Sequence, residues 1–290
     1  MPIINIGSIN VDHAYRLPRF IQPGETLACA SYVRGLGGKG MNQSIALARA
    51  GAQVAHLGAI GQNDQWAKEA VERAGLRLDD LVSSDVETGH AIIQIDAAGE
   101  NCILLYPGAN HALTIDHVHK VLAKYPMYQW VLLQNETNVV GQALALAADA
   151  GRRVVFNPAP CDVSLAKLPL ERLAVLLVNE LEACQLTGCT SQGPAFAQLC
   201  QRCPDTLVVM TLGAQGLIAA RASQQWALAA QPTHVVDTTG AGDTITGYLL
   251  AGLDEGMDEP QALAFALKAA AITVSRMGAA ASIPMRSELV

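Results

Sequence analysis

The segment 235–253, VVDTTGAGDTITGYLLAGL, contains the residues best suited to carry chemistry. Gly240 and Gly242 flank Ala241, and two glycines allow a tight turn in which a ligand approaches the backbone without meeting a Cβ atom. A helical pattern begins at about Asp243. The N–H groups of Gly240, Ala241 and Gly242 are therefore expected at a helix N-terminus, where free donors and the helix dipole bind anions.

Asp243 would stand beside an anion bound at this turn. A carboxylate repels phosphate, so it is a poor choice for binding alone. It suits a general base that takes the proton from a hydroxyl group attacking a phosphoryl group. In the alternative interpretation Asp243 is a helix N-cap and the glycines only shape the loop. The spacing alone leaves both interpretations open.

A second glycine-rich segment, GLGGKGMNQSIALARAG, begins at Gly35 and leads into another helical pattern. It is not a P-loop, because Gly40 follows Lys39 where a P-loop has the Ser or Thr that binds magnesium. Its backbone donors and the amide of Asn42 could hold a polyhydroxy ligand. A loop that only acts as a hinge would show the same glycines.

Two shorter motifs are compatible with a nucleotide site. TLGAQG at 211–216 could cradle phosphates or lie against a base, although a simple glycine turn would look identical. In NELEA, Asn179 and Glu182 are three residues apart and share one face of a helix start. Their oxygens suit magnesium or its bound waters. A capping box produces the same spacing.

The elements that must position these motifs follow a strand–helix alternation. Strands are expected at 3–6, 54–57, 131–133, 154–156, 175–178 and 207–210. Helices are expected at 42–50, 64–74, 116–124, 139–150, 180–186, 244–253 and 261–276. The strands lack polar alternation, which predicts an α/β fold over 1–290 with a mainly parallel sheet sandwiched by helices. A hairpin at 216–221 and 225–230 is expected at the sheet edge.

Two segments, about 14–36 and 86–108, interrupt this alternation and predict a small β-sheet that serves as a lid over a ligand site. Polar residues also follow most of the apolar runs, and open α/β sheets bind ligands at the carboxyl ends of their strands. These residues are Asn10, Asp12, Glu136, Asn157, Asn179 and Thr211. The sequence therefore predicts one cleft that these side chains share.

Composition limits the class of protein. The 290 residues are 51% hydrophobic and 16% charged, which permits a large core, and the net charge of -7 argues against a nucleic-acid binder. Without a visible secretion signal or a membrane-length apolar run, a cytoplasmic protein with no membrane partner is expected. Cys200 and Cys203 form a CxxC pair, but a helix that begins near 193, turns Cys200 toward the core and ends at Cys203 explains the spacing better than a zinc or redox site.

The motifs together resemble one family, the ribokinase-like (PfkB) sugar kinases, and most closely its ribokinase branch. The motifs that carry the resemblance, in family order, are GSINVD, GGKGMNQ, GAN at 108–110, NPAP at 157–160, NELEA with LTG, TLGAQG and DTTGAGD. The resemblance implies an α/β sandwich with a small β lid, and a homodimer formed through that lid.

The resemblance also implies a role for individual residues. It places the sugar contacts at Asn10, Asp12, Gly37, Gly38, Lys39, Asn42 and Glu136. It places the nucleotide contacts at Asn179, Thr211, Leu212, Gly213 and Gly216. Gly240, Ala241 and Gly242 become the anion hole and Asp243 the general base. Glu182 would hold Mg²⁺ through water, and a monovalent cation, K⁺, would be bound at Asp237, Thr239, Thr273, Arg276, Gly278 and Ser282.

Four positions depart from the family pattern. Ile245 stands where Phe is usual, and Thr246 replaces a smaller or amide residue. Leu267 and Lys268 stand where relatives often place Asn or His near the nucleotide base, which puts the adenine contact in doubt.

The expected activity is ATP-dependent phosphorylation of a primary hydroxyl of a pentose or a similar sugar. One alternative is a nucleoside kinase, which the low aromatic content of 4% disfavours. The other is a non-catalytic sugar or nucleotide sensor on the same fold. The presence of Gly240, Gly242 and Asp243 favours an enzyme.

Overall fold

The structure is a computed structural model that describes residues 3–289. In chain order its strands are β1 (Ile3–Ile6), β2 (Asn10–Arg16), β3 (Ser31–Gly37), β4 (Val54–Gly61), β5 (Leu81–Ser84), β6 (Gly89–Ile95), β7 (Asn101–Tyr106), β8 (Trp130–Gln134), β9 (Arg153–Asn157), β10 (Val175–Asn179), β11 (Leu207–Thr211), β12 (Leu217–Arg221) and β13 (Gln224–Leu228). The α-helices are α1 (Lys39–Arg49), α2 (Gln65–Arg73), α3 (Ile115–Lys124), α4 (Val140–Asp149), α5 (Glu180–Thr187), α6 (Gln192–Arg202), α7 (Ala241–Glu255) and α8 (Glu259–Val274). Short 3₁₀ helices are η1 (Gly108–His111), η2 (Val163–Lys167), η3 (Leu170–Arg172), η4 (Gly213–Gln215) and η5 (Arg286–Glu288).

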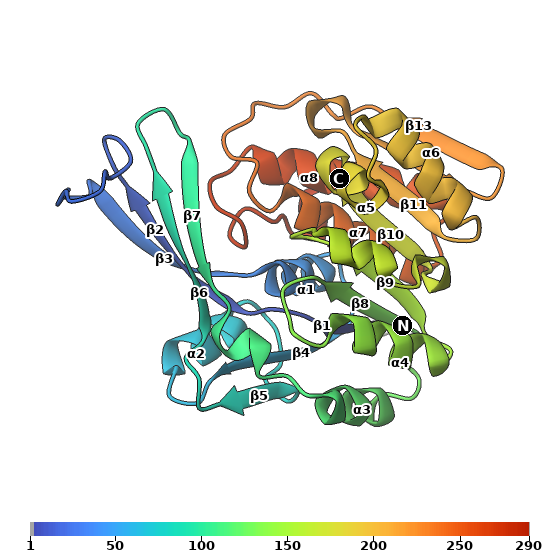
Figure 1. The fold of residues 1–290 in the computed structure, drawn as a ribbon, viewed down its shortest axis with the longest axis horizontal. Coiled ribbons are helices and arrows are strands. Elements are labelled where there is room, and N and C mark those ends of the chain that lie inside the picture. The colour runs from blue at the N-terminus through green and yellow to red at the C-terminus, as the bar shows by residue number, and fades with distance from the viewer. Residues whose placement is uncertain (1–2, 290) are drawn as a thin grey trace.

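The large sheet has nine strands in the order β13-β12-β11-β10-β9-β8-β1-β4-β5. The strands from β11 to β5 pair in parallel, whereas β12 and β13 pair antiparallel at one edge. The predicted mainly parallel sheet and its edge hairpin are therefore confirmed (Figure 1). The strand β5 at the opposite edge was not expected, because four residues give too short a pattern to recognise.

Both faces of this sheet are covered by helices, which explains why its strands are apolar throughout. Alternate strand residues enter two separate cores, with Ile3 and Leu132 on one face and Ile4 and Leu133 on the other. The first core is closed by α1, α2, α7 and α8. The second is closed by α3, α4, α5 and α6. A period-2 strand with two buried faces needs apolar residues at every position.

The small sheet has the order β3-β2-β6-β7 and extends beyond the helices at one end of the molecule, on the left in Figure 1. Its strands come from the two segments that interrupt the strand–helix alternation, but β2 begins earlier than expected, at Asn10. Asn10 and Asp12 thus belong to the small sheet, although they were expected only to follow β1. The chain passes from one sheet to the other within three residues.

The helices α1 and α7 each begin three residues earlier than the sequence suggests, and both begin after a glycine with positive φ. α1 starts at Lys39 after Gly38, whose φ is 88°, and α7 starts at Ala241 after Gly240, whose φ is 80°. This left-handed backbone region favours glycine. A Cβ atom on Gly40 would lie 2.6 Å from the Cα atom of Gly7, so the start of α1 packs directly on the β1–β2 connection.

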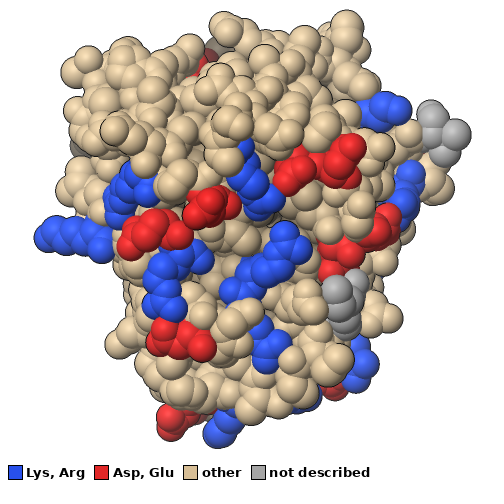
Figure 2. All heavy atoms as spheres, turned by 90° about the vertical axis from the view of Figure 1, so that its right-hand side faces the viewer, with Lys and Arg blue, Asp and Glu red and all other residues tan. Residues whose placement is uncertain are grey.

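Figure 2 shows the face at the right-hand side of Figure 1. Acidic and basic side chains alternate across the middle of this face, next to a broad area without charged residues. Within residues 3–289, no helix is both long enough and apolar enough to cross a membrane.

Candidate active site

A cavity of about 360 Å³ lies where the carboxyl ends of β9, β10 and β11 meet the starts of α1, α5 and α7. Its lining residues are Lys39, Asn157, Ala159, Leu177, Val178, Asn179, Glu182, Thr211, Thr238, Thr239, Gly240, Gly242, Asp243 and Thr246. Asn157, Asn179 and Thr211, at the ends of three neighbouring strands, therefore meet in one cavity, as an open α/β sheet predicts. The other three residues expected in a shared cleft, Asn10, Asp12 and Glu136, are not among its lining residues.

Asp243 lies in the first turn of α7 and is only 7% exposed. Its two carboxylate oxygens accept hydrogen bonds from neighbouring residues of α1: Asn42 Nδ2 lies 3.0 Å from Oδ2, and Gln43 Nε2 lies 2.9 Å from Oδ1. The N-cap of α7 is Gly240. The alternative interpretation of Asp243 as an N-cap is therefore wrong, since its carboxylate faces another helix.

The close packing of α1 against α7 makes these bonds possible. Gly247 on α7 lies so near Ala46 on α1 that a Cβ atom at position 247 would overlap the Ala46 side chain. Thr246 stands one residue earlier, and its hydroxyl donates to the carbonyl of Gly242 at 2.9 Å. Ile245 packs in the first core.

The helix start offers fewer free donors than the sequence suggested. The N–H of Ala241 donates to the carbonyl of Thr238 at 3.2 Å, which closes a turn before the helix. Gly240 and Gly242 line the cavity, but Ala241 does not. Three backbone N–H groups were expected to bind an anion here. Of these, Gly242 is the residue that lies in the first turn of α7 and also borders the cavity.

Lys39 introduces a positive charge among several carboxylates. Asp243, and then Glu136 and Glu182, raise the pKa of Lys39, while burial acts in the opposite direction. Burial raises the pKa of Glu136, and it also raises that of Glu182. The ammonium group thus stays protonated and partly balances a cluster of like charges.

Glu136 also connects three segments of the chain. Its Oε2 atom accepts a hydrogen bond from the Ser8 hydroxyl and another, at 2.8 Å, from the backbone N–H of Lys39. Ser8 Oγ in turn accepts from the N–H of Gly40 at 3.1 Å. Glu136 therefore fastens the β1–β2 connection to the start of α1.

Asp12 and Asn10 lie on β2, where the small sheet meets the large one. The Asp12 carboxylate lies so close to Gly37 that any Cβ atom there would overlap it. Burial, with the nearby carboxylates of Glu136 and Asp243, raises the pKa of Asp12 to about 6. Asn10 Oδ1 accepts from Asn110 Nδ2 at 2.8 Å.

The sequence did not assign a role to Asn110 or Gln43. Asn110 Oδ1 accepts from the N–H of Ile9 at 2.8 Å, so this residue holds the entry to β2 as well as Asn10. Both residues lie inside quoted motifs, GAN and GGKGMNQ, and that position was the signal available for them.

Asn179 and Glu182 form a capping box at the start of α5 and line the cavity as well. Asn179 Oδ1 accepts from the N–H of Glu182, and Glu182 Oε2 accepts from the N–H of Asn179, both at 2.8 Å. The capping interpretation is therefore confirmed. It does not conflict with a ligand role, because both residues border the cavity.

The TLGAQG segment contributes less to this cavity than expected. Thr211 lines it, whereas Leu212, Gly213 and Gly216 are absent from its lining. Gly216 has a φ of 102°, and a Cβ atom there would overlap the carbonyl of Leu228 on β13. This glycine is therefore required in the turn between β11 and β12, where the backbone passes close to the end of β13.

These positions can now be compared with known proteins. The model of the pfkB family of carbohydrate kinases matches residues 3–286. A ribokinase from Haemophilus influenzae is 36% identical over 98% of this chain and 95% of its own length. The chain belongs to the PfkB family of carbohydrate kinases. It is an ATP-dependent sugar kinase.

Solved structures agree with the observed fold of the kinase. The ribokinase from Cryptococcus neoformans var. grubii serotype A, solved in complex with ADP, superposes with a TM-score of 0.86 at 34% identity and covers 99% of this chain and 98% of that one. The Arabidopsis thaliana ribokinase complexed with ribose and ATP gives a TM-score of 0.85 at 27% identity, with coverage of 99% and 97%.

The positions predicted to bind a monovalent cation lie around the loop that precedes α7 in the kinase. Asp237 Oδ1 accepts from the N–H and the hydroxyl of Thr239, and Asp237 Oδ2 accepts from the N–H of Gly278 at 2.8 Å. Partial burial acts to raise the pKa of Asp237, but these donors outweigh it and lower the pKa below its usual value.

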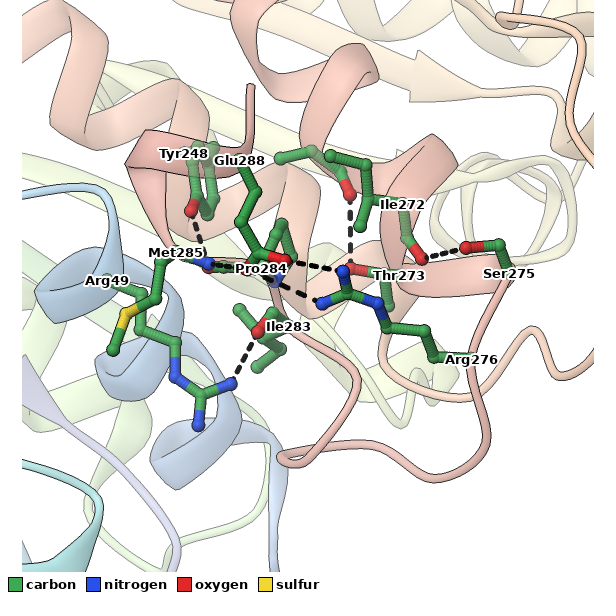
Figure 3. A network of polar contacts seen from close by, with 11 residues as sticks. Arg49, Tyr248, Ile272, Thr273, Ser275, Arg276, Ile283, Pro284, Met285 and Glu288 are labelled. Carbon is green, nitrogen blue, oxygen red and sulfur yellow. Dashed lines mark hydrogen bonds and ion pairs between the residues drawn. The ribbon is translucent and has the colours of Figure 1, made fainter. Parts of the chain in front are cut away.

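The C-terminal segment 276–288 is held against α1 and α7. Figure 3 shows the Arg276 guanidinium pointing at Glu288, and Arg49 of α1 donating to the carbonyl of Ile283. Tyr248 donates to the carbonyl of Pro284 at 2.7 Å (Figure 3). The Arg276 side chain is thus committed to an ion pair, so a cation could use only its backbone.

The remaining candidate positions lie in other surroundings. Thr273 and Ser282 direct their hydroxyls to the carbonyls of Ala269 and Ala279. Leu267 is buried in the first core, whereas Lys268 lines a second cavity of about 380 Å³ beside Gln231, Pro232 and Thr233. α6 ends with Cys203 as its C-cap and the partly buried Cys200 packs against the second core, as the packing interpretation of the CxxC pair expects, but the more deeply buried of the two is Cys203.

Asn in place of Asp12 should stabilise the kinase near neutral pH. The folded-state pKa of about 6 lies above the ordinary value of 3.8, so ionised Asp12 opposes folding once the pH rises through 6. Asp12→Asn should therefore raise the free energy of unfolding by about 2 kcal/mol at pH 7.5, with a gain that disappears toward pH 4. Thermal unfolding at both pH values tests this. An equal shift in Tm at pH 4 and pH 7.5 would contradict it.

Proposed function

We propose that this kinase transfers the γ-phosphate of ATP to a primary hydroxyl of a pentose, with ribose as the first candidate. The observation that carries the proposal is the Asp243 carboxylate, buried at the start of α7 and held by two amide donors beside a cavity that Lys39 and Gly242 line. The relatives named ribokinase, and the plant structure complexed with ribose and ATP, support the choice of sugar.

In the proposed mechanism Asp243 accepts the proton of the sugar hydroxyl as that oxygen attacks the γ-phosphate. A phosphoryl transfer of this kind depends on positioning and on stabilising charge that spreads over the phosphoryl oxygens. Lys39 and Gly242 line the cavity, and the ammonium group of Lys39 and the N–H of Gly242 would provide that stabilisation. Asp243 therefore acts on the nucleophile, while the donors around it act on the transferred group.

The donor set at the start of α5 suits Mg²⁺. The carboxylate of Glu182 and the side chain of Asn179 line the cavity and provide oxygen atoms, which this hard cation prefers. We propose that Glu182 holds the ion through water, because its Oε2 atom already accepts the N–H of Asn179. When bound, Mg²⁺ would neutralise part of the phosphate charge.

The sugar would bind between the start of α1 and the small sheet. Asn42 Oδ1 is buried and has no hydrogen-bond partner among the described residues, so it can accept a hydrogen bond from a sugar hydroxyl. Asp12 and Asn10 lie on β2 with polar atoms near the same helix start, and Gly37 and Gly38 provide the adjoining backbone. We propose that the small sheet acts as a lid over this position.

A monovalent cation, K⁺, would bind beside Asp237. Within residues 3–289, no group of three or more His, Cys, Asp or Glu side chains could hold a metal ion. The cation would therefore combine the Asp237 carboxylate with oxygens of Thr239, Thr273, Arg276, Gly278 and Ser282. Bound there, it would steady the loop that leads into the anion-binding turn.

We also propose a homodimer formed through the small sheet. Val33, Ile103 and Leu105 lie on the same face of that sheet by register, and they are 63%, 56% and 44% exposed. An apolar sheet face of this kind is costly to leave in water. A sedimentation-velocity mass of one 30.5 kDa chain at micromolar concentration would contradict the dimer.

A panel of acceptors tests the proposed activity. ADP release should be measured with ribose, other pentoses, hexoses and nucleosides, each with and without K⁺. Ribose or a close pentose should give the highest kcat/KM, and K⁺ should increase it. Preference for a nucleoside would instead identify a nucleoside kinase. Tight sugar binding without ADP release from any acceptor would indicate a sensor.

A further inference from the structure

Gln43 occupies a position that connects the proposed base to the core of the kinase. Its side chain is fully buried, and its Nε2 atom lies 2.9 Å from Asp243 Oδ1 and 3.0 Å from Asn157 Oδ1. We propose that Gln43 is a positioning residue that holds the Asp243 carboxylate in the orientation needed to take a proton. This inference rests on the proposed role of Asp243 as general base.

The direction of the amide of Gln43 is determined by a chain of hydrogen bonds that starts at a backbone carbonyl. Asn5 Nδ2 donates to the carbonyl of Gly40 at 2.7 Å, and a carbonyl can only accept. The oxygen of Asn5 must therefore point the other way, where it accepts from Gln134 Nε2 at 3.0 Å. The same Gln134 nitrogen donates to Gln43 Oε1 at 2.7 Å.

A second anchor acts on Gln43 from the opposite side. Asn157 Nδ2 donates to the carbonyl of Leu177 on β10 at 3.1 Å, so Asn157 Oδ1 must act as an acceptor. If the Gln43 amide turned over, its oxygen would face the oxygens of both Asp243 and Asn157. Two backbone carbonyls, on α1 and on β10, therefore require that Gln43 donates to Asp243.

This arrangement restricts the rotation of the carboxylate. Asn42 holds one oxygen of Asp243 and Gln43 holds the other, from consecutive positions on α1. Donors on both oxygens keep the carboxylate plane fixed. Lys39 is the first residue of the same helix, so α1 would position both the ammonium group that faces the phosphate and the carboxylate that acts as base.

Charged groups from several elements surround the carboxylate that Gln43 contacts. Lys39 faces it from α1, Asp12 from β2, Glu136 from the segment after β8, and Glu182 from α5. These four charged groups also influence the pH dependence of turnover. The test therefore compares variants in which all four residues are unchanged.

Two substitutions of Gln43 test the proposal. Gln43→Met keeps the length of the side chain but removes the donor, and it should lower kcat by about 10- to 100-fold while both KM values change by less than about threefold. Gln43→Glu places a second carboxyl group against Asp243, so it should lower kcat further and move the acidic limb of the kcat profile to higher pH. Steady-state kinetics from pH 5 to pH 9 measure both effects.

The matched control is Ser44→Ala, at the next position of α1. Ser44 Oγ accepts from Asn5 Nδ2 at 2.8 Å, yet the bond from Asn5 to Gly40 remains when the hydroxyl is lost. This variant should lower Tm but leave kcat and its pH profile unchanged. If Gln43→Met does not fold, Gln134→Met provides the test instead. It removes the donor to Gln43 without touching Asp243, and it should lower kcat by about 3- to 10-fold.

The outcomes separate this inference from the proposed function. If Gln43→Met and Gln43→Glu keep the wild-type kcat and pH profile while Asp243→Asn is inactive, only the role of Gln43 is refuted. Equal losses of kcat in Ser44→Ala and Gln43→Met would also refute it, because the effect would then be structural. Activity retained in Asp243→Asn would refute the proposed base itself.

Discussion

Asp243→Asn should lower kcat by about 10²- to 10⁴-fold, the usual contribution of a general base. The amide has nearly the shape of the carboxylate but cannot take the proton of the sugar hydroxyl. One of its two donor contacts, from Asn42 or Gln43, would also be replaced by a contact between two N–H groups. ATP binding should change little, because the nucleotide does not depend on this proton transfer.

ADP release and calorimetric titration with ATP measure these two quantities separately. Asp116→Asn is a matched control, since Asp116 is also an acidic residue in the first turn of a helix but lies on the exposed side of α3. It should retain wild-type kcat. Turnover of Asp243→Asn within about threefold of wild type would show that another group accepts the proton.

Lys39→Met should have the second-largest effect, on both catalysis and stability. Without the ammonium group the cavity loses a positive charge facing the proposed phosphate site, and kcat/KM should fall by about 10²-fold or more. The carboxylates of Asp243, Glu136 and Glu182 would also repel one another without compensation. The free energy of unfolding should therefore fall by about 2–3 kcal/mol at pH 7.5.

The pH dependence of this destabilisation follows from the direction of the pKa shifts. The pKa of Lys39 is raised, so the lysine itself stays charged at every pH below the ordinary lysine value and loses its charge only in strong alkali. Burial raises the pKa values of Glu136 and Glu182, which begin to take up protons as the pH falls. The difference in the free energy of unfolding between Lys39→Met and wild type should therefore be smaller at pH 5 than at pH 7.5.

Urea unfolding at the two pH values provides the measurement. Lys68→Met serves as the control, because Lys68 is on α2 and its ammonium group reaches only the carbonyl of Gln62 at the surface. That variant should remain within about 0.5 kcal/mol of wild type. A destabilisation of Lys39→Met that does not change with pH would contradict the charge-balance account, and an unchanged kcat/KM would exclude Lys39 from catalysis.

Much of the frame of this kinase could be predicted from the pattern of its sequence. Continuous apolar runs indicate strands with two covered faces, and the alternation with helices indicates a parallel sheet, as β1 and β8 to β11 confirm. Gly240 located the turn before α7, because the left-handed backbone at this position leaves little choice of residue. These features depend on residues that are close together in the sequence, so the spacing of residue types predicts them.

The start of α1 could not be predicted from the local sequence. Gly40 was understood only as evidence against a P-loop, yet its role is to let the helix pack on Gly7. The sequence does not reveal the beginning of the helix at Lys39, because the glycines on both sides of this lysine disfavour a helix locally. Contact with the β1–β2 connection, which lies thirty residues earlier, outweighs the weak local preference.

The sequence by itself determined the fold class, the family motifs and the types of residue gathered at the strand ends. Only the tertiary structure decided whether Asp243 caps its own helix or faces another one, because the spacing of DTTGAGD fits both. The packing of α1 on α7 settles this, since it brings Asn42 and Gln43 to the carboxylate from 200 residues away in the chain. Hydrogen bonds between such distant residues leave no periodic trace in the sequence.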